Sequence, residues 1–260
     1  VVGNANLRPE KTIQGELGLQ QQISYNMALD VTAYFRDIRD LAGTRSEEIT
    51  LFGGSASYNR LENSDFAYVR GLVLSLSMIE TNGFSASLDY TFQIAKGSAS
   101  DPQQARNAIA GGSLPEIQLT PLDWDQRNTV NMSLAYDRAN WGISGIGQFG
   151  SGLPYTPLST EDISSLVLNS GKKPLTWNVD LKGYFIPRDG LRLFIRAENI
   201  FDRLNPYTVY DDSGVADFTR WENIAKSQNT GEPINSISKW FLNETFYSNP
   251  RRIEIGLSYV

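Results

Sequence analysis

The sequence predicts an all-β protein, an antiparallel transmembrane β-barrel to which this chain contributes about nine strands. Apolar and polar residues alternate along segments of about ten residues, and the connections between these segments are alternately short and long. No window of roughly 18 residues is apolar enough for a membrane helix. A strand with one face toward lipid and the other toward a wet interior has this two-residue period.

The first four alternating segments lie at residues 12–22, 25–37, 66–78 and 84–92. In the second segment Met27 and Leu29 fall on one face, whereas Asp30 falls on the other. Leu88 and Asp89 alternate in the same way in the fourth segment. Successive side chains of a strand point to opposite faces, so this spacing predicts strands rather than helices.

Five further segments follow at residues 130–136, 141–150, 177–185, 191–197 and 253–259. The segment at 141–150 is the weakest strand prediction, because its four glycines blur the apolar face. Its spacing also fits G-x-G-x-x-G, but a dinucleotide site needs a helix after the glycines, and Ser151, Gly152 and Pro154 indicate a loop. We therefore interpret these glycines as small residues on a barrel strand, and we expect no amphipathic helix between the strands.

The connections alternate in length. Short ones are expected at residues 23–24, 80–83, 137–140 and 187–190, and long ones at 38–65, 96–123, 151–174 and 203–249. Structureless connections of over about twenty residues are unusual in a compact soluble domain. Short periplasmic turns and long extracellular loops are typical of outer-membrane barrels.

Composition excludes several functions. The chain has no His and no Cys, and its net charge is -6. These counts exclude His-dependent and thiol-dependent catalysis as well as His-ligated and Cys-ligated metals. The acidic balance gives no electrostatic footprint for nucleic acid. We therefore predict no enzyme, no catalytic residues, no metal, no cofactor and no nucleic-acid partner.

The polar face of the strands supplies the candidate ligand contacts. The residues that we expect to face the lumen are Asp30, Arg36, Asp89, Asp180, Lys182, Arg192, Arg196 and Glu198. Mixed charges suit a crowded, wet lumen, but they also suit solvent, so a soluble sandwich remains an alternative at this point. Pairs of acidic residues, such as Asp123 with Asp125, are interpreted as solvated loop tips.

Six motifs in order resemble the C-terminal part of the barrel of TonB-dependent outer-membrane receptors. They are Asn6-Leu7-Arg8-Pro9-Glu10-Lys11-Thr12, VTAYFRDIRD at 31–40, LDWDQR at 122–127, SGLPY at 151–155, ENIFD at 198–202 and PRRIEIGLSY at 250–259. The resemblance covers nearly the whole chain. It implies that residues 1–260 form the last nine strands of a barrel of about 22 strands.

The resemblance also implies a function. Proteins of this family import scarce ligands such as metal chelates, vitamins, glycans or peptides across the bacterial outer membrane, using energy from a TonB-type transducer. The plug domain, which contacts that transducer, and the N-terminal strands are expected outside this chain, in the same or a separate polypeptide. A passive porin or an adhesin barrel without a plug is the alternative.

The outer-membrane location that the resemblance implies would bring lipid partners as well. Outer-membrane lipid and lipopolysaccharide are expected to surround the barrel, and Arg251 and Arg252 are candidates for contacts with lipopolysaccharide phosphates. The apolar residues that we expect to face lipid are Met27, Leu29, Val31, Leu88, Leu134, Leu181 and Leu257.

Overall fold

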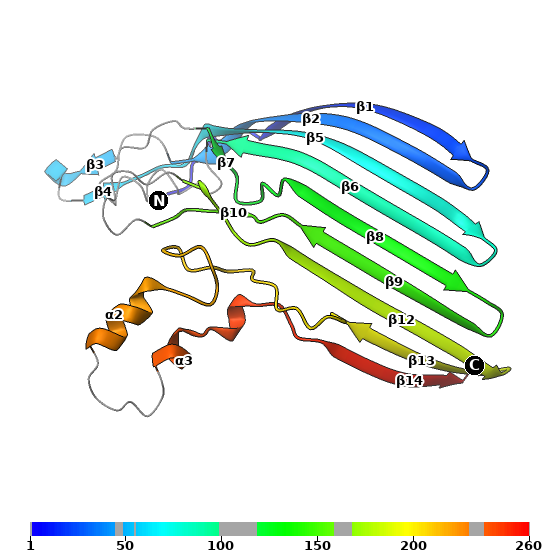
Figure 1. Ribbon diagram of the computed structural model, residues 1–260. Helices are drawn as coiled ribbons and strands as arrows, with labels where there is room; N and C mark the ends of the chain where they lie inside the picture. Colours follow the sequence, from blue (N-terminus) through cyan, green and yellow to red (C-terminus); the bar gives the residue numbers. More distant parts are fainter. Residues whose placement is uncertain are drawn as a thin grey trace.

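The computed structural model describes residues 2–44, 49–54, 56–98, 119–158, 168–228 and 237–259. Nine long strands lie side by side in one curved sheet (Figure 1). They are β1 (Lys11–Ser24), β2 (Met27–Gly43), β5 (Glu62–Thr81), β6 (Phe84–Gly97), β8 (Asn128–Asp137), β9 (Trp141–Gly150), β12 (Thr176–Arg188), β13 (Leu191–Glu198) and β14 (Arg252–Tyr259). Each of the nine predicted segments corresponds to one of these strands, which confirms the predicted antiparallel β architecture.

Five short strands lie in the connections. They are β3 (Ile49–Leu51), β4 (Ala56–Tyr58), β7 (Thr120–Pro121), β10 (Pro154–Tyr155) and β11 (Gly171–Lys172). β3 pairs with β4 and β10 pairs with β11, whereas β7 joins the large sheet alongside β6. The long connections therefore carry hairpins of their own.

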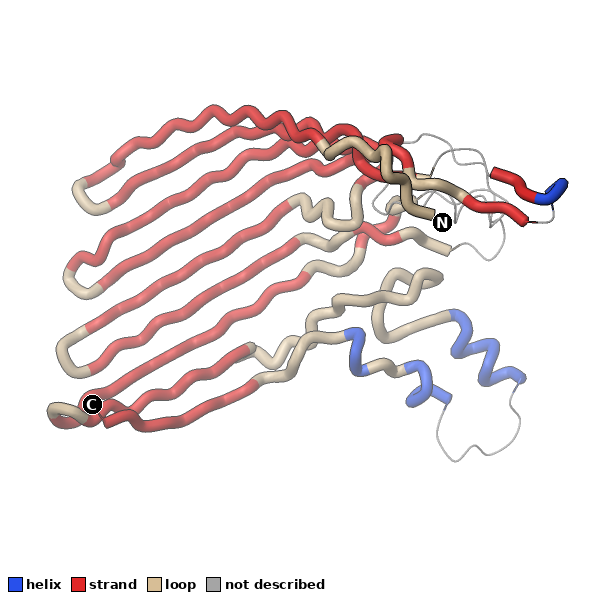
Figure 2. Tube along the Cα trace, turned by 180° about the vertical axis from the view of Figure 1, so that it is seen from behind, coloured by secondary structure: helices blue, strands red, loops and turns tan. Residues whose placement is uncertain are grey.

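The order of strands in the sheet is the order along the chain, β1-β2-β5-β6-β8-β9-β12-β13-β14, and neighbouring strands are antiparallel. The short turns lie at one end of the sheet and the long connections at the other (Figure 2). Among the described residues β1 and β14 are the two edges and do not pair with each other. The sheet is thus an open part of a barrel.

The short turns follow local chemistry. Asn82-Gly83 joins β5 to β6 with positive φ at both residues, 54° and 85°, as a two-residue hairpin turn with the strand twist requires. The turn predicted at residues 23–24 is wrong, because β1 continues to Ser24 and the turn occupies residues 25–26. There the Ser24 hydroxyl donates to Asn26 Oδ1 at 2.6 Å, a side-chain bond that favours the turn one step later.

The pairing register separates an apolar face from a polar face, because directly opposed residues of antiparallel strands point to the same side. One row across the sheet contains Leu29, Leu76, Leu88, Met132, Gly147 and Val179. The adjacent row contains Gln20, Asp30, Ser75, Asp89, Asn131, Gln148 and Asn178. By this register all seven residues predicted to face lipid share the apolar face, and all eight predicted lumen residues share the polar face.

The apolar face stays exposed. Leu17 is 79% exposed and Ile255 is 82% exposed, although both are large apolar residues. The buried apolar cluster is small and lies on the polar face near the long connections, where Val69 and Ala95 pack with Leu122. A soluble sandwich would bury its apolar face against a second large sheet, and the described residues form only one. The exposed apolar face and the single large sheet of the described residues favour the membrane barrel over the soluble sandwich.

Helices occur in the connection between β13 and β14. They are α2 (Arg220–Gln228), α3 (Ile237–Phe241) and the 3₁₀ turn η3 (Glu244–Phe246), and a further 3₁₀ turn, η1 (Phe52–Gly54), follows β3. The expectation of no helix between the strands is therefore wrong. Asp212 Oδ2 accepts hydrogen bonds from the backbone N–H of Arg220 at 2.7 Å and from Thr219 Oγ1 at 2.9 Å, which caps the start of α2. None of the described helices is long and apolar enough to cross a bilayer.

Candidate functional site on the polar face

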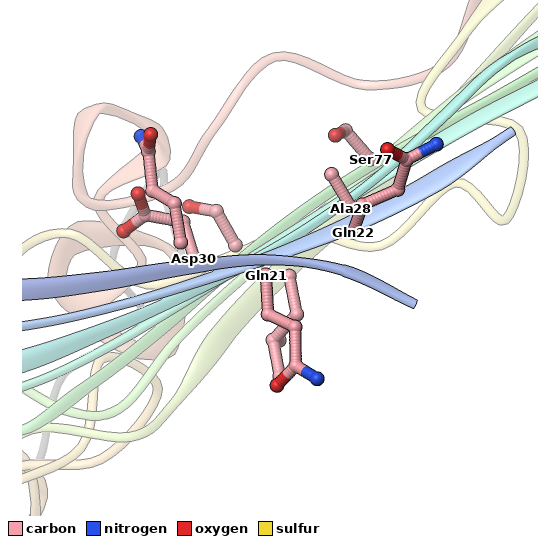
Figure 3. Close-up of a pocket in the computed structure, with 8 residues that line it drawn as sticks. Gln21, Gln22, Ala28, Asp30 and Ser77 are labelled. Atoms are coloured by element: carbon pink, nitrogen blue, oxygen red, sulfur yellow. The ribbon is translucent and has the colours of Figure 1, made fainter. Parts of the chain in front are cut away.

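A hollow lies at the β1 edge of the polar face. It has a volume of about 290 Å³ and is lined by residues of β1, β2 and β5. Figure 3 shows Gln22, Asp30 and Ser77 on one side of the strands and Gln21 on the other. Thr32 Oγ1 donates to Asp30 Oδ1 at 2.8 Å and orients the carboxylate. The hollow offers amide groups and one negative charge beside an unpaired strand edge.

A second hollow, of about 270 Å³, lies over β8, β9 and β12. Its polar side chains include Asn131, Gln148 and Asn178, and Tyr207 lies beside them. Asn178 Oδ1 is buried and accepts no hydrogen bond from the described part of the chain. Uncharged amides can donate to and accept from a neutral ligand without a counter-charge. The sequence prediction missed this hollow because it considered only charged residues, although the amides alternate with apolar residues in the printed sequence.

Arg36 on β2 and Asp89 on β6 belong to the same polar face as the two hollows. The Arg36 guanidinium lies 5.8 Å from the centre of the Tyr34 ring. The Tyr34 hydroxyl donates to Gln93 Oε1 at 3.2 Å, and Asp89 is exposed in the row described above. The side chains of Arg36 and Asp89 are both exposed on the polar face, and their contact with a ligand stays a prediction.

Asp180 has a structural task that the sequence prediction did not foresee. Its Oδ1 accepts hydrogen bonds from the backbone N–H of Asn199 at 2.8 Å and from Asn178 Nδ2 at 2.7 Å. Glu198 stands opposite Arg252 in the pairing of β13 with β14. The ENIFD motif thus ties β12 to the end of β13. One carboxylate oxygen of Asp180 is engaged in these hydrogen bonds.

Asn199 and Asn205 close the base of the last long connection. Asn199 Nδ2 donates to the carbonyl oxygens of Arg203 at 2.9 Å and Asn249 at 3.1 Å. Asn205 accepts from the backbone N–H of Trp177 at 3.0 Å and donates to its carbonyl at 2.8 Å. These bonds hold the start and the end of the connection together.

Lys182, Arg192 and Arg196 form a second charged region on β12 and β13. Arg196 Nη1 lies 3.5 Å from a Glu254 carboxylate oxygen, and Lys182 stands opposite Arg196. The Arg192 guanidinium lies 3.9 Å from the centre of the Tyr184 ring. The eight predicted residues therefore lie in two groups, with the uncharged hollow between them, and do not converge on one point.

Asp125 of the LDWDQR motif is fully buried and corrects the interpretation of this acid as a solvated loop tip. It accepts from the backbone N–H of Ala95 at 2.8 Å and from Arg127 Nε at 2.8 Å. Lys172 Nζ lies 3.7 Å from Asp125 Oδ2. Partial burial lowers the pKa of Lys172, and the Asp125 charge opposes that shift. Asp125 thereby links the connection after β6 to the β10–β11 hairpin.

No metal centre is evident in the described ranges. They contain no group of three or more His, Cys, Asp or Glu side chains that could hold an ion. Two further pairs of adjacent acidic residues lie outside the described residues: Glu47 with Glu48, and Glu161 with Asp162.

Solved structures with the same fold include receptors and an outer-membrane transporter. A mutant of the ferric enterobactin receptor PfeA of Pseudomonas aeruginosa is 16% identical, with a TM-score of 0.59 over 98% of this chain and 32% of that chain. The ferripyoverdine receptor of Pseudomonas aeruginosa is 12% identical, with a TM-score of 0.60 over 97% of this chain and 27% of that chain. The outer membrane transporter YddB of Escherichia coli is 12% identical, with a TM-score of 0.60 over 81% and 31%.

The chain thus spans about a third of the length of these structures or less. No curated protein matches the sequence. The family model described as TonB dependent receptor-like, beta-barrel matches residues 1–200. This protein chain therefore belongs to the TonB-dependent receptor-like β-barrel family, as part of a barrel in the bacterial outer membrane.

Proposed function

We propose that the complete protein is an energy-coupled outer-membrane receptor and transporter for a scarce ligand such as a metal chelate, a vitamin, a glycan or a peptide. The observation that carries this proposal is the continuous polar face with two hollows on a sheet of this family. A polar face with amide, acidic and basic side chains can contact a ligand that passes along it.

The proposed orientation follows from the two faces. The exposed apolar face meets lipid, and the polar face lines the lumen, because only apolar side chains are stable against hydrocarbon. The short turns lie in the periplasm and the long connections outside the cell. Asp30, Arg36, Asp89, Lys182, Arg192 and Arg196 are then accessible to a ligand or a plug domain, whereas Asp180 and Glu198 act at the β12–β13–β14 junction.

The proposed partners are those of the family. Further barrel strands complete the wall beside β1 and β14, a plug domain fills the lumen, and a TonB-type transducer supplies energy through that plug. Three similar structures are named as receptors for ferric catecholate, ferripyoverdine and ferric enterobactin. Their identities of 12 to 16% speak for the fold and not for the ligand, so all four ligand classes stay in the proposal.

Conductance of the complete protein in a planar lipid bilayer separates this proposal from a passive porin. A receptor with a seated plug should show a closed baseline, whereas a porin would give a steady ionic current. Uptake of labelled ferric chelates, cobalamin, oligosaccharides and peptides by intact cells should stop when a protonophore removes the inner-membrane gradient. A steady current together with protonophore-insensitive uptake would establish the porin instead.

The uncharged hollow gives a residue-level test. Gln148→Trp fills the hollow and should weaken binding of the ligand found in that uptake assay by about tenfold, a loss of about 1.4 kcal/mol. Ile143→Trp is the matched control, because it adds bulk on the apolar face of the same strand, away from the residues that line the hollow. Equal affinities for both variants in a titration would exclude the hollow from the ligand path.

A further inference from the structure

Basic side chains gather on the apolar face where four strands meet the long connections. The register places Lys11 opposite Arg39, and Lys96 opposite Tyr68, on that face. Arg70 lies two residues from Tyr68 along β5, opposite Phe35 and Ile94. β1, β2, β5 and β6 lie side by side (Figure 1), so these cations share one patch, which we call the rim patch: Lys11, Arg39, Arg70 and Lys96.

The rim patch lies at the outer boundary of the apolar band. On β6 the apolar face runs from Phe84 to Ile94, and Lys96 is the next residue on it. Ten residues at about 3.3 Å each, tilted by about 40°, span about 25 Å, the height of the apolar band in such barrels. Lys96 therefore lies at the level of lipid head groups, and Arg70 reaches that level along its aliphatic stem.

Carboxylates neutralise only part of the patch. Arg39 pairs with Asp37 at 2.7 Å, and Lys11 lies 3.7 Å from Asp40. In the described ranges neither Arg70 nor Lys96 forms an ion pair, and exposed Arg70 contacts only the Tyr68 ring, 5.2 Å from its centre. These two cations are available to an external anion in a chain whose net charge is -6.

The patch is local rather than a belt around the sheet. At the same end of the apolar face, β8, β9 and β12 carry Asn128, Phe149 and Trp177, which have no charge. Arg252, which the sequence suggested as a lipid contact, lies on the polar face and contacts Glu254. The Arg251 guanidinium donates to the carbonyl of Ile200 at 3.4 Å. At this end of the sheet the basic charge that faces lipid is therefore concentrated over β1, β2, β5 and β6.

We propose that the rim patch is a binding site for a phosphorylated glycolipid of the outer leaflet, the lipid A part of lipopolysaccharide. Arg70 and Lys96 contact its phosphates, and the apolar residues below them, such as Leu72 and Phe92, contact its acyl chains. A soluble anion would not gain these acyl contacts, and a protein partner would have to enter the bilayer to reach them. Guanidinium and ammonium groups bind phosphate oxygens through charge-assisted hydrogen bonds.

The test uses the complete receptor, extracted in detergent, stripped of lipid and titrated with lipid A that carries its phosphates. Arg70→Gln with Lys96→Gln should weaken binding about 30-fold, which is roughly fivefold for each cation near the anionic surface. Arg138→Gln with Arg188→Gln is the matched control, because it removes two exposed cations at the short-turn end. The control should change affinity less than about twofold. Heat-modifiable mobility in gels checks that all variants are folded.

Two further arms identify the source of the phosphate. The first arm uses lipid A from which the phosphates have been removed enzymatically. Its affinity for the unmodified receptor should be as low as the affinity of phosphorylated lipid A for the variant with Arg70→Gln and Lys96→Gln. Inorganic phosphate in excess should not displace lipid A; full displacement would overturn the glycolipid assignment. Charge-conserving Arg70→Lys should retain most of the affinity, whereas unchanged binding by the double Gln variant would refute the site.

The inference rests on the proposed orientation and not on transport. If the sheet had the opposite orientation, the Arg138 and Arg188 substitutions would weaken lipid A binding and those at Arg70 and Lys96 would not. A wrong orientation therefore gives a different result from a wrong site. The titration includes no uptake step, so failure of the transport proposal leaves its outcome unaffected.

Discussion

Burial of a single loop carboxylate shows how strand lengths create a polar contact. β6 continues to Gly97, but its neighbour β8 begins only at Asn128, so the backbone N–H of Ala95 has no ladder partner in β8. Asp125 supplies the missing acceptor at 2.8 Å. A buried N–H without a partner costs free energy, and this is why an acid in a connection between strands is fully buried.

Asp125→Ala should lower the free energy of unfolding by about 3 kcal/mol, because it leaves the Ala95 N–H and the Arg127 guanidinium without their acceptor. Asp125→Asn retains one acceptor oxygen and should cost roughly half as much. Denaturant unfolding of the complete protein in detergent measures both values. Equal stability of the alanine variant and the unmodified protein would contradict the structural role of Asp125.

At the scale of elements, alternation was sufficient to predict every long strand and to assign both faces, since a two-residue period depends only on the printed residues. The turn at residues 25–26 and the start of α2 were missed because they depend on side-chain bonds. Asp212 caps α2 from eight residues away, and no local pattern shows that contact. The uncharged hollow was missed because three strands have to be brought together before Asn131, Gln148 and Asn178 become neighbours.

The two faces predict different effects on stability for substitutions at neighbouring residues of β5. Leu76→Arg places a charge in the central row of the apolar face and should destabilise the barrel by about 2 to 4 kcal/mol. Ser75→Arg places the same side chain between Asp30 and Asp89 in the polar row and should be nearly neutral. Unfolding titrations in lipid vesicles measure the difference, and similar losses for both variants would exclude the assigned faces.

For the whole molecule, orientation can be tested by labelling, since the chain has no native Cys. Ser227→Cys in exposed α2 should react with a membrane-impermeant maleimide on intact cells, because the long connections are proposed to lie outside. Asn140→Cys, in the exposed turn between β8 and β9, should react only after the outer membrane is permeabilised. The reverse pattern would invert the proposed orientation.

The open sheet leads to a second prediction for the whole molecule. β1 and β14 each leave one edge unpaired among the described residues, and unsatisfied backbone groups in hydrocarbon cost several kcal/mol each. Residues 1–260, secreted without further barrel strands, should therefore give no heat-modifiable, protease-resistant monomer. A monodisperse monomer in water without detergent would refute membrane insertion of this sheet.

The closed base of the last long connection has an evolutionary consequence. Asn199 bonds to the Asn249 carbonyl, and Asn205 N–H donates to Ser248 Oγ at 2.9 Å, so residues 206–247 begin and end at a fixed junction. The entropy of closing a loop grows only with the logarithm of its length, about 0.6 kcal/mol for each doubling. Insertions, deletions or whole exchanges beyond this junction leave the pairing of β13 with β14 unchanged. Recombination can thus replace the whole connection while the strands of the sheet are inherited unchanged.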